Sequence, residues 1–367
     1  MIKRSFIIVV FIIVCTSLLA QKRHEINFPD IQGYQTLKCD FHIHSVFSDG
    51  SVWPTIRVEE AWREGMDAIA ITEHIEYLPH KKDIVADHNR AFEIASPAGK
   101  DRDIVVIHGS EITRSMPPGH SNALFLKNSN LLDTAKYIDA FKAAKAQNAF
   151  IFWNHPAWSR QQPDTTLWWK EHTELYEAGL MHGIEVVNEH EYSAEAHKWA
   201  IEKKLTMLGN SDIHNPIQMD YDFSMGEHRP MTLVLAKEKS VEGIRDALMN
   251  RRTIVYHNNL LIGDNAYLKE LFEKSIRVEK VSRNNKSIHV TIYNSSSITF
   301  EIKKLKGNDP NLEYFRNLKI EAGGYTSFTL YEKELTKNTG FSLQLEVQNL
   351  LIAPGKGMHY NLNFQIN

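Results

Sequence analysis

The spacing of apolar residues predicts an α/β region that covers most of the chain. Up to about residue 264, apolar runs with the length of buried strands alternate with segments that have helical periodicity. The strand-like runs are residues 66–72, 103–110, 121–126, 149–154, 183–188, 205–211 and 231–236. The helical patterns are residues 54–64, 131–147, 192–204 and 241–251. Strands that alternate with helices favour a parallel sheet, but periodicity alone leaves an open sheet and a barrel as alternatives.

The pattern changes after about residue 264. Short, often alternating runs follow one another, separated by turns rich in Asn, Gly and Lys, which is typical of a small antiparallel β-sandwich. These runs are residues 275–281, 287–292, 298–305, 325–331 and 341–347. We therefore expect a barrel or open-sheet domain over residues 21–264 and an accessory all-β domain over residues 265–367. The second region contains no cluster of potential metal ligands. We therefore expect an accessory module with a role in packing or on the carbohydrate side.

The first twenty residues have the pattern of a secretory signal peptide. Lys3 and Arg4 precede an apolar run over residues 6–20, which is shorter than the roughly 20 residues that a membrane-spanning helix needs. We expect cleavage after Ala20, hence export to the periplasm or secretion, with no membrane span in the mature protein. Two alternatives are an uncleaved anchor and a lipoprotein modified at Cys15, although Val14 is bulky where a small residue is needed.

Composition narrows the range of partners. The 367 residues are 43% hydrophobic, enough for a full core, and the formal net charge is −3. A nucleic-acid-binding domain would usually carry a basic face, so we expect a small-molecule substrate rather than nucleic acid. The sequence gives no indication of the oligomeric state.

Histidines and carboxylates recur at the ends of the apolar runs. His42 and His44 lie two residues apart, so on a strand their side chains point to the same face. Asp49 follows in a Ser-Asp-Gly turn and adds an oxygen ligand. The other candidates are His74, Glu111, His120, His155, Asp212 and His214, each at or beside the end of an apolar run. Imidazole and carboxylate groups without thiolates suit zinc, manganese or iron, and ligands at strand ends favour the mouth of a barrel.

Over roughly residues 36–262, the order of these motifs resembles that of the polymerase-and-histidinol-phosphatase (PHP) superfamily of metal-dependent phosphoesterases. Within this superfamily, the chain most resembles the secreted or periplasmic phosphodiesterase-like branch. The resemblance implies a distorted (β/α)7 barrel and two to three divalent metal ions (Zn, Mn or Fe). It places His42, His44, Glu111 and Asp212 at one metal, His74 and His120 at a second bridged by Glu111, and Asp49, His155 and His214 at a third. Two positions depart from the family pattern. Asp49 stands where some members have histidine, and Glu73 stands where many have aspartate.

The function implied is that of an exported metal-dependent phosphoesterase, and a phosphodiesterase in particular, that uses a metal-activated hydroxide. Glu111 and Asp212 are the catalytic candidates. A metal-dependent hydrolase of carboxyl esters, carbamates or amides is the first alternative, and a non-catalytic binding module is the second. The chain has neither a Gly-x-x-x-x-Gly-Lys phosphate loop nor a Gly-x-Ser-x-Gly elbow, which disfavours a nucleotide-triphosphate motor and a serine hydrolase.

Basic residues near the expected mouth are candidates for substrate contact. Arg114 follows Glu111 by three residues, and His228 and Arg229 precede the run at 231–236. Arginine binds phosphate through its planar fork of donors, but an arginine at a barrel rim is equally an ordinary ion-pair partner. Glu185, Asn188 and His190, at the end of another strand-like run, are further candidates for substrate contact.

Overall fold

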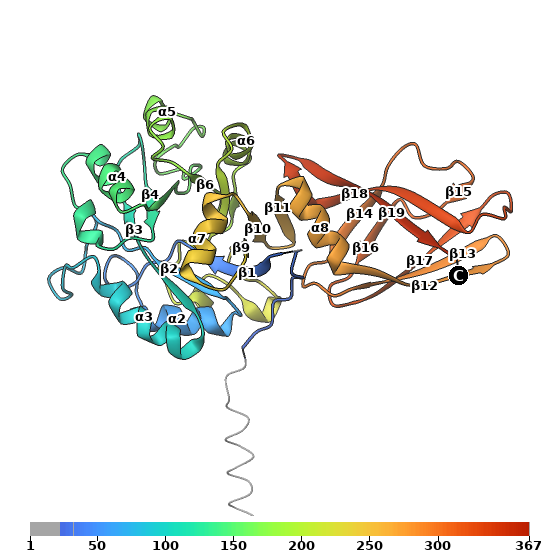
Figure 1. Cartoon of the computed structure of the whole chain (residues 1–367), viewed down its shortest axis with the longest axis horizontal. Helices are drawn as coiled ribbons and strands as arrows, with labels where there is room; N and C mark the ends of the chain where they lie inside the picture. The colour runs from blue at the N-terminus through green and yellow to red at the C-terminus, as the bar shows by residue number, and fades with distance from the viewer. Residues whose placement is uncertain (1–22, 32, 367) are drawn as a thin grey trace, which may run out of the picture.

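The structure, a computed structural model, describes residues 23–31 and 33–366. The predicted signal peptide, residues 1–20, lies outside the described residues. The chain forms an α/β domain and, beside it, an elongated all-β domain (Figure 1). Within the described part of the chain, no helix has both the length and the apolar character needed to cross a membrane.

The strands of the α/β domain form a mixed sheet that curves into a distorted barrel. All the strand-like runs predicted in this region are strands. The barrel strands are β1 (Gln35–Asp40), β2 (Ala68–Ile71), β3 (Val105–Ile112), β4 (Ser121–Leu124), β5 (Phe150–Trp153), β6 (Gly183–Asn188), β8 (Thr206–Asn210) and β9 (Met231–Ala236), with the short β7 (Glu191–Tyr192) beside β6. The strands β1, β2 and β3 are parallel, as are β5, β6 and β8.

Strand β4 runs antiparallel to both of its neighbours, β3 and β5. The connection from β3 to β4 spans only residues 113–120, whereas a parallel crossover needs about a dozen residues or more. The strand therefore returns in the opposite direction, and its first residue lies at the same edge of the sheet as the last residues of β3 and β5. This explains why His120 precedes its strand while the other ligand candidates follow or end theirs.

The barrel closes between β8 and β9 through a side chain rather than a strand ladder. The hydroxyl of Thr232 accepts a hydrogen bond from the amide of Gly209 and donates one to its carbonyl, both at 3.0 Å. A glycine is needed at position 209 because a Cβ there would lie 2.3 Å from a side-chain carbon of Val255. The strand β9 is antiparallel to β1 and completes the ring.

Helices cover the outside of the barrel. They are α2 (Pro54–Arg63), α3 (Arg90–Arg102), α4 (Tyr137–Ala146), α5 (Lys170–Glu177), α6 (Ala194–Glu202) and α7 (Val241–Met249). The helix expected over residues 131–147 begins only at Tyr137, because Asn128 caps a separate 3-10 turn, η1 (Ser129–Leu132). The helix α3 was not predicted, since the face it buries consists of Ala91, Ala95 and Gly99 and lacks large apolar side chains.

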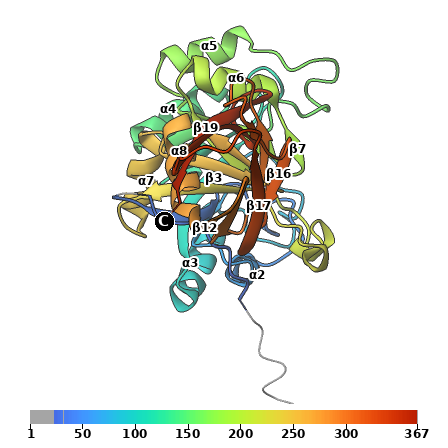
Figure 2. The same ribbon diagram turned by 90° about the vertical axis from the view of Figure 1, so that its right-hand side faces the viewer.

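The all-β domain continues the barrel sheet. A hairpin of β10 (Thr253–His257) and β11 (Leu260–Gly263) extends it from β9, and β11 pairs in parallel with β18 (Gly340–Ala353). Strands β14 (Phe300–Lys304) and β19 (Lys356–Gln365) pair with β18, β16 (Asn317–Ile320) pairs with β14, and α8 (Asn265–Ser275) packs beside this sheet. The second sheet contains β12 (Ile276–Asn284), β13 (Ser287–Asn294), β15 (Leu312–Glu313) and β17 (Gly324–Glu332). The expected α/β domain followed by an all-β domain is thus confirmed, and the sandwich strands face the viewer in Figure 2.

Candidate metal centre

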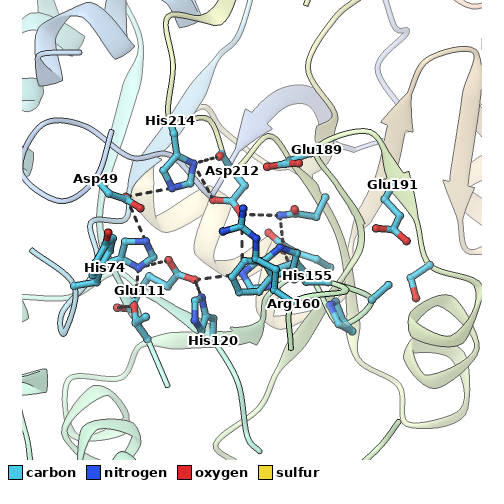
Figure 3. Close-up of a pocket in the computed structure, with 18 of the residues that line it drawn as sticks. Asp49, His74, Glu111, His120, His155, Arg160, Glu189, Glu191, Asp212 and His214 are labelled. Atoms are coloured by element: carbon cyan, nitrogen blue, oxygen red, sulfur yellow. Dashed lines mark hydrogen bonds and ion pairs between the residues drawn. The ribbon is translucent and has the colours of Figure 1, made fainter. Parts of the chain in front are cut away.

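The predicted ligands converge on one cavity at the barrel mouth. The cavity has a volume of about 670 Å³, and seven of the nine predicted ligands line it (Figure 3). His42 and His44 are fully buried just behind them. These side chains come from the ends of β1, β2, β3, β4, β5 and β8, so the sheet edge itself builds the site.

Three groups of these side chains have the geometry of metal-binding sets. In each group, one nitrogen or oxygen from every member lies within 4.8 Å of the others. The groups are His42, His44 and Asp212; His74, Glu111 and His120; and His44, Asp49, His74 and His214.

Glu111 and Asp212 occupy the centre of the cluster. Glu111 Oε2 lies 2.7 Å from His74 Nδ1, and its Oε1 lies 2.9 Å from His120 Nδ1. Asp212 Oδ1 lies 3.1 Å from Nε2 of both His42 and His44. Both carboxylates therefore face ligands from more than one set, as a bridging role requires.

The grouping agrees with the one implied by the resemblance for His74, Glu111 and His120, but two histidines have further or different neighbours. His74 joins Asp49, whose Oδ1 lies 3.3 Å from His74 Nε2 and 3.2 Å from His214 Nε2. His155 lies instead beside Glu111 Oε1, at 3.6 Å, with its ring centroid 4.9 Å from that of His120. His74 therefore lies between two of the groups, and His155 lies near Glu111 rather than near Asp49.

The chemistry of the buried atoms fits divalent cations. His42 Nε2, His44 Nε2, Asp49 Oδ1 and Glu111 Oε2 are buried and make no well-aligned hydrogen bond within the described residues; their close neighbours are other ligand atoms, such as His74 Nδ1 at 2.7 Å from Glu111 Oε2. Leaving such atoms unsatisfied is costly. Lone pairs of two imidazoles and two carboxylates that face one another would be satisfied together by metal ions.

Outer contacts fix the orientation of His42. Its Nδ1 lies 2.9 Å from Glu185 Oε1, so the Nδ1 proton is donated there and the Nε2 lone pair faces the centre. Glu185 also accepts hydrogen bonds from Asn210 Nδ2 at 2.8 Å and from the amide of His155 at 2.6 Å. Glu185 therefore orients two of the predicted ligands, which sequence position alone did not reveal. Glu73 likewise bonds Ser45 and Ser48 instead of entering any of the three ligand groups.

A buried arginine links the two loops that carry ligands from β1 and β8. From α2, Arg57 donates hydrogen bonds to the carbonyl oxygens of His44, His214 and Asn215, each at 2.7 Å. Glu60 Oε2 accepts a further bond from Arg57 at 2.8 Å. The guanidinium thus fixes the backbone at His44 and His214 without touching the ligand atoms themselves.

The site has an uneven distribution of protons when no metal is bound. Burial and the neighbouring His214 and His74 lower the pKa of His44 to about 3. Burial would also lower the pKa of His74, but Glu111 and Asp49 outweigh it and raise the pKa to about 10. Metal binding at His74 must therefore displace a proton, which makes affinity depend on pH.

None of the three basic residues predicted to contact substrate lines the metal cavity, and the prediction is wrong for Arg229. Its side chain is fully buried and binds Glu64 at 2.6 Å and Asp40 at 3.0 Å. His228 stacks on Tyr256 with ring centroids 4.1 Å apart and lines a second cavity of about 560 Å³, separate from the metal centre. Arg114 pairs with Glu76 at 2.7 Å and lines an adjoining hollow that shares His120, Trp158 and Arg160 with the metal cavity, so its contact with substrate stays a prediction.

Arg160 is the basic side chain that lines the metal cavity (Figure 3). It is exposed, and its guanidinium lies 5.8 Å from the ring centroid of Trp158. The segment between β5 and α5 has no periodic pattern, so residue spacing alone does not predict that Arg160 returns to the cavity. Its position five residues after His155 was the one available hint.

Comparisons with known proteins agree with this geometry. The family described as PHP domain matches residues 40–240, and the family described as Ig-like domain matches residues 275–363. A crystal structure from Bacteroides vulgatus, described as a two-domain protein containing a predicted PHP-like metal-dependent phosphoesterase, is 53% identical. The match covers 94% of this chain and 100% of the Bacteroides vulgatus chain, with a TM-score of 0.91.

Two further structures are too dissimilar in sequence and fold to support a conclusion about function. A Bifidobacterium adolescentis protein described as a metal-dependent phosphoesterase has 15% identity over 59% of this chain and 97% of its own, with a TM-score of 0.42. An amidohydrolase of Chromobacterium violaceum has 16% identity over 48% of this chain and 88% of its own, with a TM-score of 0.36. The search of curated proteins found no match.

Proposed function

Because the chain belongs to the PHP domain family, we propose that it is a metal-dependent phosphoesterase and that its substrates are phosphodiesters. The observation that carries this proposal is the set of facing, buried and unsatisfied ligand atoms around Glu111 and Asp212. The similar Bacteroides vulgatus protein, described as containing such an enzyme, supports the same reaction class. Two to three ions of zinc, manganese or iron would suit these ligands.

Metal ions bound at these residues would lower the pKa of water and neutralise charge on the phosphoryl oxygens. The side chains of the protein supply the remaining parts of the reaction. Burial alone would raise the pKa of Glu111, but His74, His120 and His42 hold it well below its ordinary value. Glu111 therefore stays ionised and can hold cations.

Asp212 is the group placed to move a proton. It lines the cavity, and Asn188 Nδ2 donates to its Oδ2 at 3.4 Å. In the hydrolysis, an oxygen of water bonds to phosphorus, the bond from phosphorus to the leaving oxygen breaks, and that oxygen gains a proton. The Asp212 carboxylate can accept the proton from water and return it to the leaving oxygen.

Arg160 gives the cavity a preference for phosphoryl groups over carbonyl groups. The planar guanidinium can donate two hydrogen bonds to the two non-bridging oxygens of a phosphodiester. A neutral carboxyl ester has a single carbonyl oxygen and gains little from such a donor in the ground state. Within the described residues, no carboxylate pairs with Arg160, so its donors are available to substrate.

We also propose that the protein is exported after removal of residues 1–20. This proposal rests on the basic start, the short apolar run and the small residue Ala20. Mature protein that begins at Gln21 and is recovered outside the cytoplasm is the expected result. Cytoplasmic protein that retains Met1 would refute it.

The activity can be tested with three chromogenic esters. Metal-free protein would be reconstituted with Zn²⁺, Mn²⁺ or Fe²⁺ and assayed with bis(p-nitrophenyl) phosphate, p-nitrophenyl phosphate and p-nitrophenyl acetate. We expect the diester to be hydrolysed fastest. Arg160→Gln should lower kcat/KM for the diester about ten- to a hundredfold, the effect of one lost charged hydrogen bond, and leave acetate hydrolysis unchanged.

Arg90→Gln is a matched control, since Arg90 is an exposed arginine of α3 that pairs with Glu93 and lies outside the cavity. Its kinetics should equal those of the wild type. Faster hydrolysis of the acetate that Arg160→Gln does not change would instead identify a carboxyl-ester hydrolase. Binding of the esters without turnover under every metal would identify a binding module.

A further inference from the structure

The hollow that adjoins the metal cavity near Arg114 has an aromatic lining. Its volume is about 390 Å³, and it shares His120 and Arg160 with the metal cavity. Tyr77 and Trp158 also line both spaces, and among the described residues they are the aromatic side chains of the metal cavity besides its histidines. A substrate held at the metal ligands can therefore extend from the cavity into the hollow, and it would pass both rings.

The two rings lie against ligands of the metal centre. The ring centroid of Tyr77 is 5.8 Å from that of His74, and the ring centroid of Trp158 is 5.5 Å from that of His120. Tyr77 is nevertheless 52% exposed, so the protein leaves much of its ring uncovered. An aromatic group that covered this ring would remove apolar surface from water and gain ring contacts.

The two segments that carry these rings are tied to the connection between β3 and β4. Glu76, next to the first ring, accepts a hydrogen bond from the amide of Thr113 at 2.7 Å. Gln161, three residues after the second ring, donates through Nε2 to the carbonyl oxygen of Arg114 at 3.0 Å. The hollow is therefore formed before a ligand arrives, which lowers the entropic cost of binding.

The charges in the hollow favour a neutral group over a second anion. Arg114 pairs with Glu76 at 2.7 Å and donates to the carbonyl oxygen of Thr134 at 2.7 Å. Its positive charge is thus offset within the protein, and a second phosphoryl group would meet the carboxylate of Glu76 as well. Arg160, which lines both spaces, suits the phosphoryl group at the metal ligands. The aromatic rings are what the hollow offers to the rest of the substrate.

We propose that this hollow binds a planar aromatic group carried by one of the two ester oxygens of the phosphodiester, and that Tyr77 and Trp158 determine this specificity. The inference rests on the proposed function and specifies its substrate class. A phosphodiester has two alcohol moieties on one phosphorus, so a phosphoryl group held at the metal ligands and Arg160 leaves one moiety to enter the hollow. The rings contact this moiety and not the reacting atoms, so they act on affinity rather than on the hydrolytic step.

Two diesters that differ in a single ring test the proposal by direct binding. Benzyl ethyl phosphate and cyclohexylmethyl ethyl phosphate have the same charge and nearly the same size, but only the first has a planar aromatic ring. Their alkoxide leaving groups are poor, so hydrolysis is slow on the time scale of a titration. Isothermal titration of protein reconstituted with metal should give a Kd about two- to tenfold lower for the benzyl ester, the effect of aromatic ring contacts.

Tyr77→Leu and Trp158→Leu should each bring the ratio of the two Kd values towards one, whereas Tyr77→Phe and Trp158→Phe keep a ring and should retain the preference. Metal content is measured in every variant, and Tyr77→Leu decides if Trp158→Leu loses metal. Tyr331→Leu is the matched control, because Tyr331 is an exposed tyrosine of β17 that lines neither space. Its preference should equal that of the wild type.

The outcomes separate this subsite from the proposed function. Equal affinities for the two diesters in the wild type, or a preference that Tyr77→Leu leaves unchanged, would overturn the subsite proposal whatever the activity assay shows. The expected preference in a protein that hydrolyses no diester with any metal would instead overturn the phosphodiesterase proposal and leave the aromatic site standing.

Discussion

Single buried arginines determine how accurately the ligands are placed. Arg57 ties the loop after β1 to the loop after β8 through backbone carbonyls, and Glu60 holds the guanidinium in turn. Contacts of this kind fix the geometry of a metal site without touching the ion, and their loss typically lowers metal affinity about 10- to 100-fold. Lysine cannot replace this arginine, because its single ammonium group cannot reach the same set of carbonyls.

We therefore expect Arg57→Lys to weaken metal binding by about one to two orders of magnitude. Competition with a chromophoric chelator measures this affinity, and circular dichroism checks that the fold is retained. Arg63→Lys, on the same helix but at an exposed position, is the control and should bind metal as the wild type does. Unchanged affinity in Arg57→Lys would show that the carbonyl contacts do not position the ligands.

Arg229 has a structural role, and its replacement should reveal it. Removing the guanidinium leaves the carboxylates of Asp40 and Glu64 buried without their cation. We predict that Arg229→Met lowers the free energy of unfolding by about 3–5 kcal/mol, measured by denaturant titration. Full stability combined with a raised KM would contradict this role and return Arg229 to the substrate site.

At the level of helices and strands, a neutral histidine holds the start of α5. The amide of Trp169 donates to His172 Nδ1 at 3.0 Å, and His172 Nε2 donates to the carbonyl of Pro118 at 2.7 Å. Both nitrogens are thus used by the neutral ring. Burial lowers the pKa of His172 to about 4.

The sign of the resulting pH dependence follows from the two pKa values. In the unfolded chain a histidine has a pKa of about 6.5, so between pH 6.5 and pH 4 the unfolded state binds more protons than the folded state. The free energy of unfolding must therefore fall as the pH falls through this window, by up to about 3 kcal/mol for this residue. In chelator-treated protein, His172→Leu should be less stable at pH 8 but lose less stability between pH 6.5 and 4. Parallel pH profiles for the two proteins would contradict the assignment.

The elements that could be predicted from the sequence are those with a strong apolar signal. The strands β6 and β9 are short, mainly apolar segments, and the sequence predicts them with their observed bounds. The helix α3 packs through alanine and glycine, which give no hydrophobic period. Ligands such as His42 and Asp212 were identifiable because strand ends meet at one edge. The direction of the Arg229 side chain and the return of Arg160 to the cavity depend on tertiary packing, which residue spacing does not encode.

In the whole molecule, the two domains share a continuous sheet. The pairing of β11 with β18 buries Leu261 and Ile262 completely. A chain that ends at residue 264 would keep all nine ligands but expose β11 as an unpaired apolar edge, which is prone to association. We expect this truncated protein to bind metal and to form oligomers in size-exclusion chromatography. A monomeric truncated protein with unchanged thermal stability would show that the domains are independent, and loss of metal would show that the all-β domain supports the site.

The number of metal ions bound tests the central claim most directly. Protein purified without chelator would be subjected to elemental analysis alongside Glu111→Gln, which keeps the size of the side chain but removes the central charge. The three ligand groups predict two to three equivalents of transition metal in the wild type and fewer in the variant, with the fold retained. One equivalent or less in active wild-type protein, or the same content in Glu111→Gln, would contradict a multinuclear centre organised around Glu111.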